Sequence, residues 1–218
     1  KYGFLIKMKK PFENGVIQRP LYHGTTSLFV NSIKEHGLGG LNPVEEWDLV
    51  SIYRALFEVA DKKFRGAISW EKVREKASYI AYQKNSNDGL NYNFRHGNVY
   101  LTPIRKIAFD YASINEGSEL LGYLKGLVLY LIHQKGHKEV NDILPMKVAS
   151  ILSKSYQPVL LRLESVCLTE IEPENGMDKD YLLSLWQNFY ETGAVDKGLT
   201  NWKLTKPLPW GRIELLGY

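Results

Sequence analysis

The run Pro-Val-Leu-Leu-Arg-Leu-Glu-Ser-Val at residues 158–166 is the clearest β-strand in the sequence, because its apolar residues continue over a full strand length. Shorter strand patterns occur at residues 19–23, 99–101 and 212–216, so strands are expected at both ends of the chain. Helical patterns fill the intervals between them. This order of elements predicts an α+β fold.

The helical patterns follow the apolar spacing of the chain. A short helix is expected to begin near Leu28, with Thr25, Thr26 or Ser27 as its N-cap, and to stop at Gly37. Residues 42–97 resemble an insertion that contains two amphipathic helices and a polar loop. The expected helices are 47–62, 69–83, 104–111, 118–133, 139–153 and 179–190, and residues 197–210 are expected to form a loop.

The chain has 218 residues, a length that suits a single domain covering residues 1–218. Cys167 is its only cysteine, which excludes an intrachain disulfide and a cysteine-based zinc site, and no metal site is predicted. No apolar run approaches the roughly 18 residues of a membrane span, so no membrane partner is expected and the predicted location is cytoplasmic. The net charge of +4 permits a nucleic-acid partner without requiring one.

Three short motifs contain residues that suit the binding of a planar amide and a sugar. Gly24 lacks a Cβ, so its N–H and C=O could pair with both ends of a carboxamide, although a glycine here could equally serve a strand-to-helix turn. Tyr100 and Tyr111 lie eleven residues apart and could sandwich one planar ring, or both could be core aromatics. His23 could bind ribose hydroxyls or cap a turn.

A carboxylate would complete such a site by placing negative charge near a developing sugar cation. Glu214 lies within the apolar strand 212–216, which makes it the preferred candidate. Its alternatives there are an ion pair with Arg212 or Arg162, or a solvated edge strand. The carboxylates that compete with Glu214 are Glu164, Glu170 and Glu172, which lie in or just after strand 158–166.

These motifs resemble those of the ADP-ribosyltransferase superfamily of the His-Tyr-Glu type, which includes diphtheria-toxin-like enzymes and poly(ADP-ribose) polymerases. The first motif is matched by His23-Gly24-Thr25, and the second by Val99-Tyr100-Leu101-Thr102 followed by Ala108-Phe109-Asp110-Tyr111-Ala112. The resemblance implies a split mixed β-sheet core with helical insertions. Because 77 residues separate His23 from Tyr100, the resemblance also requires an insertion between them.

By the same resemblance, NAD is the substrate that donates ADP-ribose. His23 would bind the NAD ribose, Gly24 the carboxamide, and Tyr100 and Tyr111 the nicotinamide ring, while Thr25 would be a secondary polar contact. Glu214, with His23 and Tyr100, would be catalytic, and the loop 197–210 would contact the acceptor. The resemblance thus predicts a nicotinamide-binding donor site and one catalytic carboxylate.

The implied function is mono-ADP-ribosylation of a macromolecular acceptor, protein or nucleic acid, by an enzyme of toxin type that could have an inhibitor protein. Alternatives within the same resemblance are NAD hydrolysis and a reaction like that of RNA 2′-phosphotransferases, for which Arg19 is one candidate anchor. A module that binds ADP-ribose or a partner without catalysis is the remaining alternative.

Overall fold

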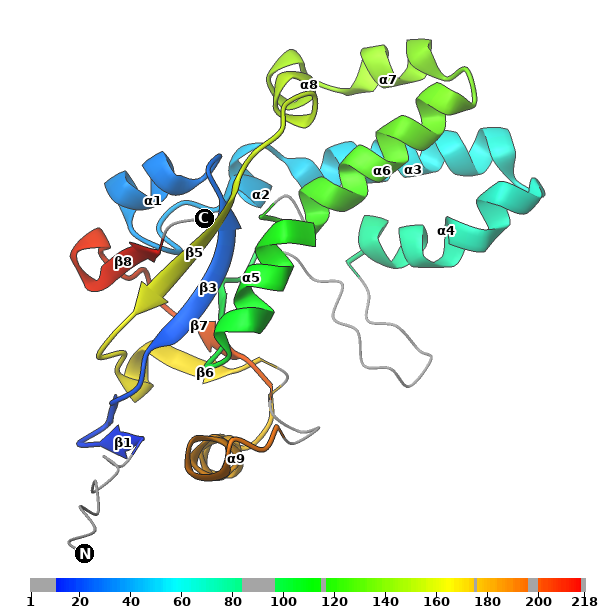
Figure 1. Ribbon diagram of the computed structural model, residues 1–218. Coiled ribbons are helices and arrows are strands. Elements are labelled where there is room, and N and C mark those ends of the chain that lie inside the picture. The colour runs from blue at the N-terminus through cyan, green and yellow to red at the C-terminus, as the bar shows by residue number, and fades with distance from the viewer. Residues whose placement is uncertain (1–10, 84–96, 115–116, 175, 196–199, 217–218) are drawn as a thin grey trace, which may run out of the picture. The chain divides into compact units, whose positions relative to one another are not determined.

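The computed structural model describes residues 11–83, 97–114, 117–174, 176–195 and 200–216. Contacts divide the chain into two compact units (Figure 1). Unit 1 contains residues 1–40, 98–113 and 158–218, and unit 2 contains residues 41–97 and 114–157. The expected insertion therefore belongs to unit 2, together with a second helical segment. Folding of the whole chain as one domain stays a prediction.

The described residues of unit 1 form two three-stranded sheets and a short hairpin. One sheet has the order β3-β5-β8 and the other the order β4-β7-β6. The strands are β1 (Phe12–Glu13), β2 (Val16–Ile17), β3 (Leu21–Thr26), β4 (Tyr100–Leu101), β5 (Pro158–Leu163), β6 (Ile171–Pro173), β7 (Trp202–Leu204) and β8 (Ile213–Leu216). The strands expected from sequence at both ends of the chain are confirmed.

The two sheets meet at a single bridge. The amide of Tyr22 donates to the carbonyl of Thr102 at 2.8 Å, and the amide of Thr102 donates back at 3.0 Å. All the strand pairings in the described part of unit 1 are antiparallel. The expected mixed sheet is therefore wrong in strand direction, which depends on connections that local sequence patterns do not specify. The α+β class is confirmed.

The α-helices in the described part of unit 1 are α1 (Val30–His36), α5 (Arg105–Ile114) and α9 (Lys179–Thr192). Helix α1 ends at Gly37 as predicted, where φ is +81°. Its N-cap is Phe29, so the expected capping role of Thr25, Thr26 or Ser27 is wrong, because β3 runs on through Thr26. Helix α5 lies alongside β3 (Figure 1).

Four strands in the described part of unit 1 were not expected from the sequence: β1, β2, β6 and β7. Strand β7 lies where a loop was predicted, and β6 follows the 3₁₀ turn η1 (Leu168–Glu170). Both have only three residues, too few to establish a period-2 pattern. Their apolar side chains are nevertheless core residues, since Trp202 is fully buried and packs with its ring centroid 5.3 Å from that of Trp186 in α9.

Unit 2 is helical in its described part. Its helices are α2 (Pro43–Glu46), α3 (Leu49–Phe64), α4 (Ile68–Ala81), α6 (Glu119–His133), α7 (His137–Ile143) and α8 (Met146–Leu152). The expected helices near 47–62, 69–83 and 118–133 are confirmed. The single helix expected at 139–153 is wrong, because Pro145, which has no amide hydrogen, separates α7 from α8. The polar loop expected at 85–97 lies outside the described residues except for Gly97.

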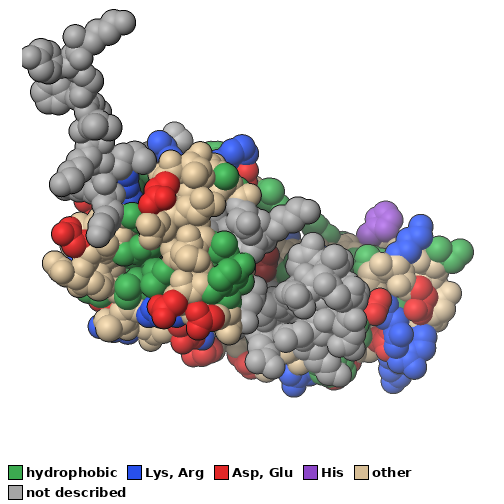
Figure 2. Space-filling model, turned by 90° about the horizontal axis from the view of Figure 1, so that it is seen from below, with side chains coloured by type: hydrophobic (Ala, Val, Ile, Leu, Met, Phe, Trp, Pro, Cys, Tyr) green, Lys and Arg blue, Asp and Glu red, His purple; other side chains and the backbone are tan. Residues whose placement is uncertain are grey.

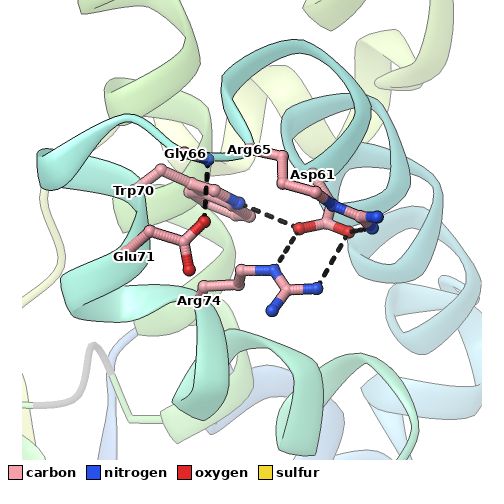
Figure 3. A network of polar contacts seen from close by, with 6 residues as sticks. All are labelled: Asp61, Arg65, Gly66, Trp70, Glu71 and Arg74. Carbon is pink, nitrogen blue, oxygen red and sulfur yellow. Dashed lines mark hydrogen bonds and ion pairs between the residues drawn. The ribbon is translucent and has the colours of Figure 1, made fainter.

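The turn between α3 and α4 is held by a buried carboxylate (Figure 3). Asp61 in α3 accepts from the indole N–H of Trp70 at 3.1 Å and from Nε of Arg74 at 2.5 Å, both in α4. Arg65 also donates to Asp61. These donors stabilise the ionised form, so the pKa of Asp61 lies far below its ordinary value. The charge of Asp61 therefore joins two helices of unit 2.

In the described residues, no helix is long and apolar enough to cross a membrane. The face shown in Figure 2 carries both acidic and basic side chains among apolar ones.

Candidate functional site

His23 and Tyr100, which are far apart in sequence, are joined by a hydrogen bond. Nδ1 of His23 lies 2.9 Å from the backbone carbonyl of Tyr100. Because a carbonyl can only accept, Nδ1 must carry the hydrogen. Burial lowers the pKa of His23 below 6.5, although the hydrogen bond to Tyr100 opposes this. The ring is therefore neutral at pH 7, and Nε2 is left as an acceptor suited to a hydroxyl group.

The backbone of Gly24 faces the edge at which the two sheets separate. Amide and carbonyl groups alternate in direction along a strand, and those of Tyr22 face β4. Those of Gly24, two residues later, therefore face the same way. The register set by Tyr22 and Thr102 would place Tyr100 opposite Gly24, but the observed bridge stops at Tyr22, and the carbonyl of Tyr100 pairs with His23 instead. The Gly24 edge thus offers a donor and an acceptor side by side.

Gly24 is also required for the packing of α5 on β3. A Cβ at this position would lie 1.8 Å from the carbonyl oxygen of Ala108 and 3.1 Å from the amide nitrogen of Ala112. Gly24 could serve both roles at once. Helix α5 contacts its Cα, whereas a ligand would bind its N–H and C=O groups. Any larger residue must push α5 away from β3.

Tyr111 is brought close to this edge by the same contact. It precedes Ala112 in α5 and shares a helical face with Ala108, three residues earlier. Its side chain is half-buried. The structure therefore brings the backbones of His23, Gly24 and Tyr100 and the Tyr111 turn of α5 together near the point where β3 and β4 diverge. Strand alternation puts the His23 side chain on the sheet face opposite α5.

Thr25 is nearly inaccessible, with 2% of its surface exposed, in the ladder opposite Val159. Its role as a secondary polar contact stays a prediction.

Glu214 is separated from His23 and Gly24 by one strand, because it lies on β8 and β5 runs between β8 and β3. It is in register with Arg162, which donates to it at 2.9 Å, and Arg162 is in register with Tyr22. Strand alternation then puts the side chains of Glu214 and His23 on opposite faces of this sheet. The ion pair with Arg162, one of the alternatives left open by the sequence, is confirmed. A catalytic role for Glu214 stays a prediction.

The three competing carboxylates have distinct surroundings. Glu164 is exposed and pairs with Arg162. Glu170 is buried and accepts from both terminal nitrogens of Arg212, at 2.8 and 3.0 Å, which helps to lower its pKa to about 2. This bidentate pairing is a structural role. Glu172 alone of the three lies in the sheet that contains Tyr100.

Glu172 belongs to a polar row that the sequence did not reveal. Tyr100 of β4 is in register with Lys203 of β7, and Lys203 is in register with Glu172 of β6. The Lys203 ammonium lies 2.6 Å from a Glu172 carboxylate oxygen. The neighbouring residues Trp202 and Leu204 point to the buried face. This alternation of apolar, charged and apolar residues was the only available signal for Lys203.

The site is chemically suited to a planar amide next to a hydroxylated ring: a backbone donor–acceptor pair, two tyrosines and a neutral histidine. In the described ranges, no group of three or more histidine, cysteine or acidic side chains could hold a metal ion. No protein-family model, no curated protein and no solved structure matches this chain.

Proposed function

We propose that the protein is an NAD-dependent mono-ADP-ribosyltransferase that acts on a macromolecular acceptor. The observation that supports this proposal most is the position of the Gly24 backbone. Its N–H and C=O groups lie beyond the bridge between Tyr22 and Thr102, where β3 is no longer paired on that side. The hydrogen bond between His23 and Tyr100 and the approach of α5, which contains Tyr111, also support the proposal. We base the proposed donor site on these contacts together with the resemblance of the motifs.

Each group would meet one need of the reaction. Cleavage of the bond between nicotinamide and ribose builds positive charge on the ribose ring, as in glycoside cleavage. Gly24 would hold the carboxamide, and Tyr100 and Tyr111 would clamp the nicotinamide ring, so the leaving group is fixed in place. Nε2 of His23 would accept from a ribose hydroxyl. Nicotinamide leaves as a neutral molecule, so no strong acid is required.

The remaining need is a negative charge near the ribose. Glu172 is favoured because it lies in the same row of one sheet as Tyr100, with Lys203 between them, although the Lys203 ammonium offsets its negative charge. Glu214 lies on the same face of its sheet as Tyr22, but β5 separates its strand from β3, and it is paired with Arg162. Both carboxylates are solvent-accessible, so both enter the proposal as candidates.

The proposal is tested with NAD labelled in the adenine ring and, separately, in nicotinamide. Incubation of the protein with a cell lysate should transfer the adenine label to a protein or nucleic-acid fraction and release nicotinamide. Nuclease or protease treatment then identifies the acceptor class. Free ADP-ribose as the sole product would favour NAD hydrolysis instead. If neither label transfer nor nicotinamide release occurs, the transferase proposal fails.

Two matched variants separate the candidate carboxylates. Glu172→Gln and Glu214→Gln each remove one charge from an exposed ion pair on a strand, so their effects on folding should be similarly small. The variant that affects the catalytic carboxylate should lower transfer by about 100-fold or more while NAD binding is largely retained. Full activity in both would remove both residues from the mechanism.

A second candidate function is a module that binds ADP-ribose or a partner without catalysis. The observation that favours it is the residue next to Tyr100 on β7: a lysine, Lys203, rather than a carboxylate. This candidate predicts NAD binding at the Gly24 edge with no nicotinamide release. It also predicts that Glu172→Gln and Glu214→Gln leave nucleotide affinity unchanged.

A toxin role, and an inhibitor protein that would hold such a toxin in check, also belong to the proposal. Both rest on the resemblance of His23, Gly24, Tyr100 and Tyr111 to the family motifs.

A further inference from the structure

A second group of polar side chains in unit 1 lies outside the proposed donor site. Several polar atoms in the described residues are buried and have no hydrogen-bond partner, and four of them belong to this group. They are Nε of Arg19, the hydroxyl oxygens of Tyr190 and Thr200, and Nε1 of Trp202. Such atoms are uncommon in folded proteins, and a bound water or a ligand group is one way to satisfy them.

Trp186 of α9 joins these four residues. Its ring centroid lies 6.1 Å from that of Tyr190 and 5.3 Å from that of Trp202. Its indole N–H donates to the Thr200 carbonyl at 3.3 Å. The Arg19 guanidinium lies over the Tyr190 ring, 5.9 Å from its centroid. The unpartnered atoms therefore belong to one connected group of side chains.

The group is rich in donors and carries a positive charge that no carboxylate offsets. In the described part of the chain, no ion pair and no hydrogen bond involves the Arg19 side chain. The Nε atoms of Arg19 and Trp202 can only donate. Burial raises the pKa of Tyr190 far above its ordinary value, so its hydroxyl keeps its proton and can also donate. An oxyanion can only accept hydrogen bonds, so it is the kind of group that these donors would bind.

The geometry points to a binding site for a phosphate group at Arg19, Tyr190, Thr200 and Trp202. A tetrahedral anion offers several oxygens to donors that come from different elements, and arginine with hydroxyl groups is a common phosphate-binding set. Arg19, Tyr190 and Thr200 are only partly buried, so a ligand could reach them from solvent. Trp202 alternates with Lys203 on β7, so this site faces away from the Tyr100 row and does not depend on the proposed function.

The test is calorimetric titration of the whole chain with inorganic phosphate, at constant ionic strength against chloride. Arg19→Gln should weaken phosphate binding about 10-fold or more, since the charged donor is lost. The matched control is Arg54→Gln. Arg54 also lies over a tyrosine ring, at 5.6 Å from the Tyr82 centroid, but its Nε is already satisfied by the carbonyl of Ala81 at 3.0 Å. Its replacement should leave phosphate affinity within about twofold.

Tyr190→Phe supplies an independent readout. With phosphate present, loss of the hydroxyl should reduce the rise in Tm that phosphate causes. Absence of any phosphate binding, or equal weakening by Arg19→Gln and Arg54→Gln, would overturn the inference. When phosphate binds, displacement by NAD identifies a nucleotide phosphate as the source, and binding that persists under saturating NAD identifies free phosphate.

Discussion

Glu170 illustrates how little a carboxylate's place in the sequence reveals about its role. It lies in an acidic stretch that resembles a solvated turn, yet its side chain is 9% exposed and accepts two hydrogen bonds from Arg212. The backbone N–H of Cys167 donates a third hydrogen bond to this carboxylate. Arg212 precedes β8 in the sequence, so only the folded chain brings the pair together.

The pairing of Glu170 predicts acid sensitivity. Its folded pKa of about 2 lies below its ordinary value of 4.5, so ionised Glu170 stabilises the fold above pH 4.5. This contribution, on the order of 2–3 kcal/mol, should be lost as the pH falls from 4.5 towards 2. Urea unfolding of the wild type and of Glu170→Gln at pH 6 and pH 3 should show a gap in stability that narrows at the lower pH. A constant gap would contradict the pairing.

The hydrogen-bonded charge of Asp61 should also contribute to the stability of the fold. Asp61→Asn removes the charge that Arg74 and Arg65 share, and it should cost about 2 kcal/mol of unfolding free energy in urea titrations. Asp142→Asn is the control, because Asp142 pairs with Lys138 in an exposed helical pair. Its loss should cost at most about 0.5 kcal/mol. Equal effects of the two variants would contradict a structural role for the Asp61 network.

Among the elements, the contact of α5 with β3 is the one on which the donor site depends. Gly24→Ala would force a Cβ against the Ala108 carbonyl, so the helix must shift or the strand distort. The expected cost is about 2 kcal/mol or more, with a parallel loss of NAD affinity. Gly126→Ala in the exposed part of α6 is the control: nothing lies within 4 Å of its Cβ, and it should stabilise the protein by up to about 1 kcal/mol. A neutral Gly24→Ala would show that the contact is not tight.

The elements that could be predicted from sequence are those with a sustained pattern. Strand β5, helices α3, α4 and α6, and the end of α1 at Gly37 all carry periodic apolar residues or a clear stop signal. Strands β6 and β7 are too short for such a pattern, and Lys203 was therefore not found. The pairing of His23 with Tyr100 and the separation of Glu214 from His23 depend on register between distant strands, which local patterns do not encode.

At the scale of the whole molecule, the donor site draws on segments that unit 2 separates in sequence. His23 and Gly24 come before residues 41–97, Tyr100 and Tyr111 come after them, and β5 follows residues 114–157. The described residues of the candidate donor site all belong to unit 1. Nicotinamide binding should therefore be a property of unit 1, whatever acceptor the protein uses.

The most direct test is an NMR titration of the ¹⁵N-labelled protein with NAD. The backbone amide of Gly24 should show one of the largest shifts, because it would donate to the carboxamide, and the amides of Tyr100 and Tyr111 should shift as well. Nicotinamide alone should shift the same amide, and Gly24→Ala should abolish the response. Binding of NAD with an unchanged Gly24 amide, or with shifts confined to unit 2, would contradict the donor site.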